Sequence, residues 1–138
     1  LDGTARGGIL VALSAKFKLP VMKVIGVATK DDLAGLAGHA AVADRILFDT
    51  RAPKDATRPG GRGETFDWHL LQGLDLKIPF MVSGGLSAEN VADAARITGA
   101  NGLDVSSGVE SAPGGKDPEK IRAFIRAVRA ATTKPVSG

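Results

Sequence analysis

The sequence of 138 residues contains no cysteine and no tyrosine, and its only aromatic residues are five Phe and one Trp. The absence of cysteine excludes disulfides, thiolate metal sites and a cysteine nucleophile within this stretch. It fits a cytoplasmic protein, which is the location we expect. The two histidines, His39 and His69, stand far apart without carboxylates at ligand spacing, so we expect no metal site.

No apolar run approaches the length that spans a membrane, and no secretory pattern opens the chain, so we expect no membrane partner. The formal net charge is only +3, and the basic residues are spread over several segments. Nucleic-acid binding would favour a basic stripe interleaved with aromatic residues, which are scarce here. We therefore expect no nucleic-acid partner.

Short apolar runs alternate with helical segments along the chain, which predicts a parallel sheet with right-handed helical crossovers. Strands are predicted at residues 21–27, 45–49, 80–83 and 103–106. Helices are predicted at residues 8–16, from 31 to 36 and on through an alanine-rich stretch, at 66–72 and 88–97, and from 117 onward. The pattern alone leaves open whether the sheet is open or closed.

Two of the helices carry clear boundary signals. Ser87 is a predicted N-cap and Gly99 is placed to end the same helix. Asp117-Pro118-Glu119 is a strong start for the last helix. Its apolar residues Ile121, Phe124, Ile125 and Val128 recur at helical spacing and are assigned to the core. We expect residues 1–131 to form one domain and residues 132–138 a disordered tail.

Two strand-to-loop junctions carry small, hydroxyl- and glycine-rich residues. Glycine lets the backbone approach a ligand closely, and exposed N–H groups and serine hydroxyls are donors for an anion. Two such loops side by side are what the last two strands of a phosphate-binding (β/α)8 TIM barrel provide. The candidate phosphate-binding residues are Gly84, Gly85, Ser106, Ser107 and Gly108, and a small phosphorylated molecule is the predicted ligand. The alternative is that both are tight turns without a ligand.

Two aspartates are candidates for chemistry. Asp49 ends a predicted strand, and a carboxyl group there points to the mouth of a parallel sheet, where it can act as a general acid or base. The long Gly-, Pro- and basic-rich segment that follows is typical of an active-site cover. Asp104 lies inside the last predicted strand and can bind substrate on the same face as Ser106. The alternatives are a cap for Asp49 and a structural partner of a basic residue for Asp104.

These residues resemble the phosphoribosylanthranilate isomerase family. The resemblance runs from about residue 19 to residue 131 and is most specific from Leu47 onward. It rests on Leu47-Phe48-Asp49, Pro53-Lys54-Asp55-Ala56, Pro59-Gly60-Gly61, Gly63, Phe66-Asp67-Trp68, Pro79 to Leu86 with Asn90-Val91, and Gly102 to Pro113 with Lys116-Asp117-Pro118.

The resemblance implies an Amadori rearrangement in tryptophan biosynthesis, on a single (β/α)8 barrel and without cofactor or metal. It implies that Asp49 is the general acid, that Asp104 contacts substrate, and that the glycine and serine residues named above bind phosphate. This chain would hold roughly the C-terminal four to five βα units. The remaining N-terminal barrel segment or a second copy of the chain is then a candidate partner.

The sequence departs from the family pattern in one important respect. The family uses a cysteine on its first strand as general base, and no cysteine is present here. We therefore expect the chain alone to be inactive or a poor catalyst. Two other interpretations stay open: a related phosphate-binding barrel enzyme, such as an indole-glycerol-phosphate synthase or a sugar-phosphate epimerase, and a half-barrel that binds phosphate or self-associates without catalysis.

Overall fold

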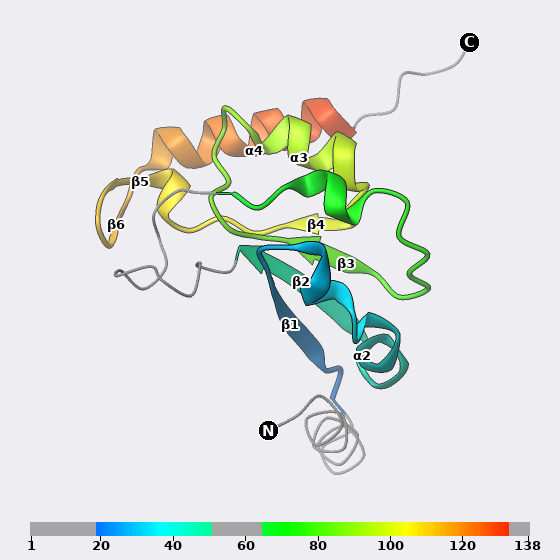
Figure 1. Cartoon of the computed structure of the whole chain (residues 1–138). Coiled ribbons are helices and arrows are strands. Elements are labelled where there is room, and N and C mark those ends of the chain that lie inside the picture. The colour runs from blue at the N-terminus through cyan, green and yellow to red at the C-terminus, as the bar shows by residue number, and fades with distance from the viewer. Residues whose placement is uncertain (1–18, 51–64, 133–138) are drawn as a thin grey trace.

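The computed structural model describes residues 19–50 and 65–132. Its centre is a four-stranded parallel sheet in the order β1-β2-β3-β4 (Figure 1). The strands are β1 (Met22–Val27), β2 (Arg45–Thr50), β3 (Phe80–Val82) and β4 (Gly102–Leu103). Helical segments lie between successive strands, which confirms the predicted α/β class and the parallel sheet.

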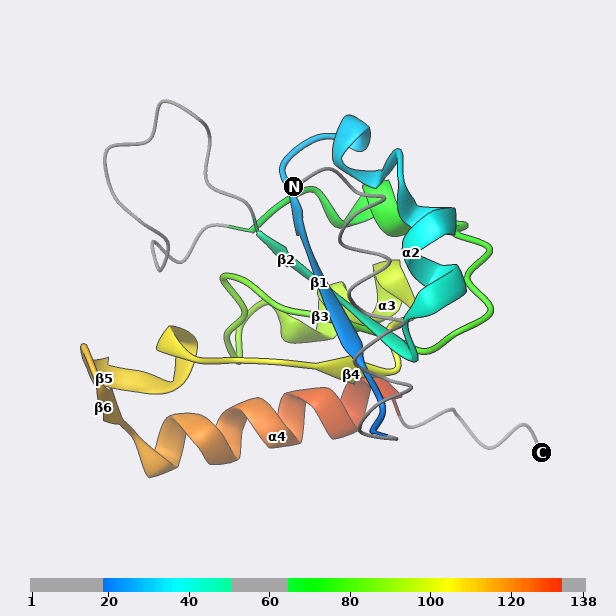
Figure 2. The ribbon, with the colours of Figure 1, turned by 90° about the horizontal axis from the view of Figure 1, so that it is seen from below.

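The helical segments lie along one side of the sheet. They are η1 (Lys30–Leu33), α2 (Leu36–Val42), η2 (Trp68–Leu71), α3 (Val91–Thr98), η3 (Ser107–Val109) and α4 (Pro118–Thr132). Helices α3 and α4 lie side by side near β3 and β4, whereas α2 lies nearer to β1 and β2 (Figures 1 and 2). A hairpin of β5 (Glu110–Ala112) and β6 (Gly115–Lys116) leads into α4.

The larger core cluster lies on the helix-covered face of the sheet. The register pairs Ile25 with Phe48 and Phe48 with Val82, so alternate residues of neighbouring strands point to the same side. These three side chains are buried, and Val24, on the opposite face, is 51% exposed. The rings of Phe48 and Phe80 meet edge to face at a centroid distance of 5.6 Å.

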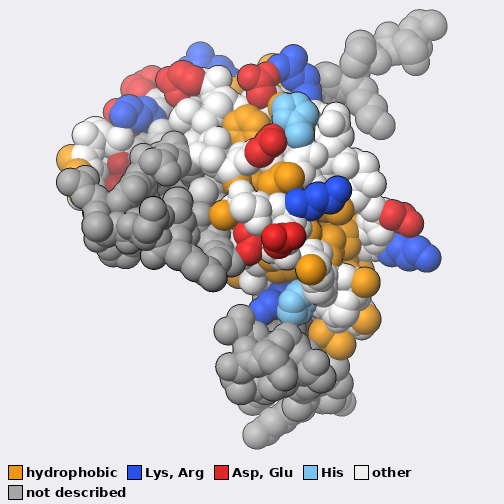
Figure 3. All heavy atoms as spheres, viewed as in Figure 1, with side chains coloured by type: hydrophobic (Ala, Val, Ile, Leu, Met, Phe, Trp, Pro, Cys, Tyr) orange, Lys and Arg blue, Asp and Glu red, His pale blue; other side chains and the backbone are white. Residues whose placement is uncertain are grey.

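A second cluster lies between α3, α4 and the loops that follow β3 and β4. It contains Leu86, Val91, Ala94, Val109 and Phe124. Trp68 and Leu103 contact both clusters, so the two cores are continuous. The outer faces of α3 and α4 carry the ion pairs Arg96–Asp93 and Arg122–Glu119, and charged side chains line this upper edge in Figure 3.

Several predicted boundaries are confirmed. Helix α4 begins at Pro118, and the Asp117 carboxylate accepts the Glu119 N–H at 2.9 Å. Gly99 ends α3 in the left-handed conformation at φ 68°. In the stripe of α4, Phe124 is buried and Ile121 is half-buried. Ile125 was assigned to the core wrongly, because 42% of it is exposed.

Three other local predictions are wrong. The helix predicted from residue 31 is divided into η1 and α2, with Gly35 at the junction. Ser87 is not the N-cap of α3, because residues 88–90 form a turn and Asn90 takes the cap position. The strand predicted at residues 103–106 pairs only at Gly102–Leu103. The helix predicted at 8–16 and residues 133–138 lie outside the described residues, and since Thr132 ends α4, the tail stays a prediction for 133–138.

Candidate active site

The carboxyl ends of β2, β3 and β4 bring three polar residues into one row. The register pairs Phe48 with Val82 and Val82 with Leu103, and the next residue of each strand is Asp49, Ser83 or Asp104. Backbone hydrogen bonds continue through this row, since Ser83 N–H donates to the Phe48 carbonyl at 2.8 Å and Asp104 N–H donates to the Val82 carbonyl at 2.9 Å. Side chains alternate along a strand, so the row lies on the face opposite the aromatic core.

Ser83 orients the carboxylate of Asp104. Its hydroxyl donates to Asp104 Oδ2 at 2.8 Å, and Ser83 is only 8% exposed. The described part of the chain records no ion pair for Asp104, so the alternative of a structural partner for a basic residue has no support there. Asp104 itself is exposed. Ser83 was not predicted as a site residue, although it directly precedes the Gly84-Gly85 pair in the sequence.

Asp49 is half-buried at the end of β2, and its Oδ1 accepts the N–H of Thr50 at 2.8 Å. The loop after β3 approaches it closely at Gly84, which adopts φ 93°. A Cβ at Gly84 would lie 2.7 Å from Asp49 Oδ1 and 2.6 Å from the Thr50 nitrogen. Glycine is therefore required here both for the positive φ and for the space beside the carboxylate.

The two candidate phosphate loops lie in direct contact. A Cβ at Gly108 would overlap the carbonyl oxygen of Leu86, so the second loop packs on the backbone of the first. Asn90 fixes the first loop from the other side: its Oδ1 accepts the Ser87 N–H at 2.8 Å and its Nδ2 donates to the Gly85 carbonyl at 2.9 Å. The structure thus brings together the glycine and serine residues that the sequence singled out.

A lysine that was not predicted as a site residue, Lys116, lies at the second loop. Lys116 Nζ is 3.0 Å from the Ser106 carbonyl oxygen, 3.3 Å from Ser106 Oγ and 3.1 Å from Glu110 Oε1. Its hydrogen bond, together with one from the Gly114 N–H, holds the pKa of Glu110 below its ordinary value. The lysine was missed because it lies on the β5–β6 hairpin, which no strand signal predicted.

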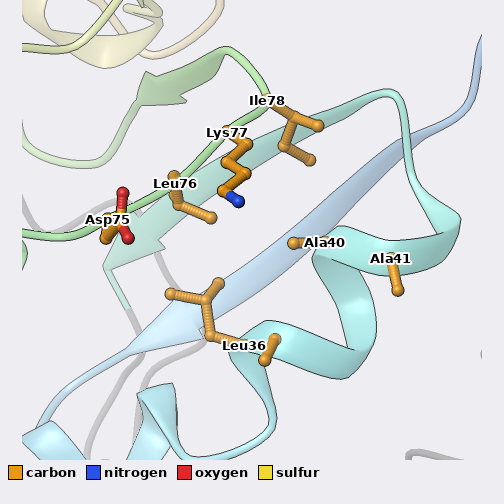
Figure 4. Close-up of a pocket in the computed structure, with 8 residues that line it drawn as sticks. Leu36, Ala40, Ala41, Asp75, Leu76, Lys77 and Ile78 are labelled. Atoms are coloured by element: carbon orange, nitrogen blue, oxygen red, sulfur yellow. The ribbon is translucent and has the colours of Figure 1, made fainter.

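Other features of the described residues do not add to this site. Among residues 19–50 and 65–132, no group of three His, Asp or Glu side chains could hold a metal ion, and no helix is long and apolar enough to cross a membrane. A hollow of about 460 Å³ lies between α2 and residues 75–78, lined by Leu36, Ala40, Leu76 and Ile78 among others (Figure 4). Residues 75–78 precede β3, so the hollow is at the opposite end of the sheet from Asp49. The predicted cover segment after Asp49 lies outside the described residues from residue 51 to residue 64.

Comparison with known proteins identifies the relatives of this chain. Residues 10–127 match the sequence model of N-(5'-phosphoribosyl)anthranilate (PRA) isomerase. A relative of that name from Bradyrhizobium diazoefficiens is 71% identical over 118 residues, covering 86% of this chain and 53% of the relative. The chain thus spans about half the length of the curated relatives it matches.

Solved structures lead to the same group. Phosphoribosylanthranilate isomerase from Thermotoga maritima matches with a TM-score of 0.73 and 34% identity, over 88% of this chain and 57% of that one. Another isomerase, in complex with reduced 1-(o-carboxyphenylamino)-1-deoxyribulose 5-phosphate, matches with a TM-score of 0.69 and 30% identity, over 88% and 55% of the two chains.

Proposed function

Because this chain belongs to the N-(5'-phosphoribosyl)anthranilate isomerase family, we propose that it serves the conversion of N-(5-phosphoribosyl)anthranilate to 1-(2-carboxyphenylamino)-1-deoxyribulose 5-phosphate in tryptophan biosynthesis. The observation that carries the proposal is the row of Asp49, Ser83 and Asp104 beside two contacting glycine- and serine-rich loops. The row offers carboxylates to a sugar, and the loops offer neutral donors to its phosphate.

Asp49 is the proposed general acid. The rearrangement begins when a proton reaches the ribose ring oxygen and the ring opens to a Schiff base. Asp49 suits this step because Thr50 N–H holds one carboxylate oxygen at 2.8 Å and fixes the direction of the other. Asp104, oriented by Ser83, is placed to contact the sugar near the ring. Gly84, Gly85, Ser106, Ser107 and Gly108 would bind the 5-phosphate.

The second half of the reaction needs a base that removes the C2 proton of the Schiff base. The chain contains no cysteine, the residue type that the family resemblance implies for this role. We therefore propose that the base is not a thiolate of this chain and that the chain alone is a poor catalyst. In this interpretation residues 1–131 form roughly the C-terminal four to five βα units of a single (β/α)8 barrel domain, and the remaining barrel segment or a second copy supplies the base.

The test is the decay of N-(5-phosphoribosyl)anthranilate fluorescence, with Asp49→Asn as the matched variant. Asparagine keeps the shape of the side chain and an oxygen for the Thr50 N–H, but it cannot deliver a carboxylic proton. Fast decay with the chain alone that is lost in Asp49→Asn would support the isomerase and refute the proposed lack of a base. Decay equally fast in both proteins would refute the role of Asp49.

Saturable binding of the product without decay would favour the alternative of a phosphate-binding half-barrel, an interpretation that the missing cysteine specifically supports. Absence of both decay and binding would refute the proposed site in this chain. Self-association and a cytoplasmic location remain predictions, and sedimentation of the purified chain tests the first of them.

A further inference from the structure

The ammonium group of Lys116 has all of its donors engaged within the protein. An ammonium carries three N–H groups. Three acceptors surround Lys116 Nζ: the carbonyl oxygen and Oγ of Ser106, at 3.0 and 3.3 Å, and Oε1 of Glu110, at 3.1 Å. No donor is left over for a bound anion in this conformation. A lysine at a phosphate loop would ordinarily be taken for a direct ligand, and this geometry argues against that role.

Glu110 holds Lys116 in this position. The two residues face each other across the β5–β6 hairpin, and the side chain of Glu110 is 13% exposed. Its second oxygen accepts the N–H of Gly114 at 2.5 Å, which ties the carboxylate to the turn of the hairpin. Glu110 therefore offsets the charge of Lys116 and keeps the ammonium beside Ser106.

Ser106 is the residue on which the second loop depends. Its carbonyl oxygen also accepts the N–H of Val109 at 3.3 Å, which closes the short helix η3. Two residues later, Gly108 packs against the Leu86 carbonyl of the first loop. The loop is thus fixed at its middle by the first loop and at its start by Lys116.

We propose that Lys116 is a positioning residue: it fixes Ser106, and through Ser106 the backbone N–H groups of Ser107 and Gly108, in the geometry that binds phosphate, without contacting the phosphate itself. This inference rests on the proposed phosphate role of the loop. It assigns anion recognition to neutral donors that are arranged in advance by the ion pair of Lys116 with Glu110 on the hairpin.

The first test measures the dissociation constant of inorganic phosphate for the chain and for two lysine variants by ³¹P NMR titration. Lys116→Met should weaken phosphate binding about fivefold to tenfold, because Ser106 loses two hydrogen bonds from a charged donor. Lys120→Met is the matched control: Lys120 lies on α4, its Nζ donates to the Glu110 carbonyl of the hairpin at 2.8 Å, and the substitution removes the same charge beside the same hairpin. Binding by the control should stay within about twofold of the parent chain.

Glu110→Gln distinguishes a positioning role of Lys116 from direct contact with phosphate, because the two roles predict opposite changes in phosphate affinity. If Lys116 contacted phosphate directly, removal of the Glu110 charge would tighten phosphate binding. If Lys116 positions Ser106, the same change weakens binding, because the ammonium is then held beside Ser106 only by a neutral amide oxygen, which is a weaker acceptor than a carboxylate. Tighter binding in Glu110→Gln, or equal binding by the two lysine variants, would overturn the inference.

Amide hydrogen exchange of Val109 provides a readout that needs no ligand. Exchange should be faster in Lys116→Met than in Lys120→Met, because the acceptor of the Val109 N–H is released. The parent chain could bind no phosphate while Val109 still exchanges faster in Lys116→Met than in Lys120→Met. That result would overturn the phosphate assignment of the loop, although it would confirm the contact between Lys116 and Ser106. A parent chain that binds phosphate with unchanged Val109 exchange would overturn the positioning role alone.

Discussion

Replacement of Gly84 by alanine tests the close approach of the loop to Asp49. Gly84 adopts φ 93°, and a Cβ there would lie 2.7 Å from Asp49 Oδ1 and 2.6 Å from the Thr50 nitrogen. The conformational cost of a side chain at positive φ is about 1–2 kcal/mol. Overpacking against a backbone nitrogen that cannot rotate away adds about 1–3 kcal/mol. We expect Gly84→Ala to lower the free energy of unfolding by about 2–5 kcal/mol in all.

Gly73→Ala isolates the crowding from the backbone strain. Gly73 has a similar φ of 76°, but nothing lies within 4 Å of the position its Cβ would take. Its substitution should therefore cost only the conformational part, about 1–2 kcal/mol. The difference between the two variants is the energy of crowding at Asp49, which we expect to be about 1–3 kcal/mol.

Both variants can be measured by urea unfolding followed through tryptophan fluorescence. Trp68 is the only tryptophan in the chain and contacts both core clusters, so its signal reports the whole fold. If Gly84→Ala cost no more than Gly73→Ala, the loop would not approach Asp49 as described, and the argument for glycine at this position would fail. Product binding should be lost in Gly84→Ala and kept in Gly73→Ala.

Three further changes test other contacts. Ser83→Ala should cost about 1 kcal/mol of stability, and a double-mutant cycle with Asp104→Ala should give a coupling energy of about 0.5–1.5 kcal/mol; a value near zero would argue against the hydrogen bond. Phe48→Ala should lower the free energy of unfolding by about 3–5 kcal/mol in the same urea assay, since Phe48 is fully buried, and a loss under 1 kcal/mol would contradict that. The pKa of Glu110 is lowered by its hydrogen bond from Lys116, so its contribution to stability is complete above its ordinary pKa of 4.5 and is lost as pH falls through the folded value. Acid unfolding curves should therefore show a smaller loss of stability below pH 4.5 in Glu110→Gln than in the parent chain, and identical curves would contradict this.

Strands β1, β2 and β3 and the last helix were predictable because local signals and tertiary packing agree there. Ile46 and Phe48 alternate with less buried neighbours and form a β-branched and aromatic strand. Asp117-Pro118 is a strong local start signal, because a proline at the first helical position needs no amide partner and the carboxylate supplies a cap. The spacing of apolar residues predicted that Phe124 is buried, but it did not predict that Ile125 is exposed. Periodicity identifies the apolar face of α4, and it does not say how much of that face the neighbouring elements cover.

The features that the sequence did not predict depend on contacts between residues that local patterns do not connect. The β5–β6 hairpin has strands too short for a periodic pattern, and the Glu110–Lys116 pair across it is visible only in the fold. Asn90 takes the cap position from Ser87 because its side chain bonds both Ser87 and Gly85, a choice that sequence spacing leaves open. The role of Ser83 becomes visible only with the strand register, which places it between Asp49 and Asp104.

That row of Asp49, Ser83 and Asp104 has a consequence for how the protein responds to ligands. Its members come from three separate strands, so no single loop or peptide carries the site, and a slip of one residue in β3 would turn Ser83 to the other face. A ligand that contacts the carboxyl ends of β2, β3 and β4 together would stabilise the pairing of these strands. At a free concentration of 100 times its Kd, such a ligand adds about 2.7 kcal/mol to global stability. Because such a ligand binds only when the three strands are paired in this register, its binding and the strand pairing are thermodynamically linked. A rise in Tm on adding the ligand therefore reports both.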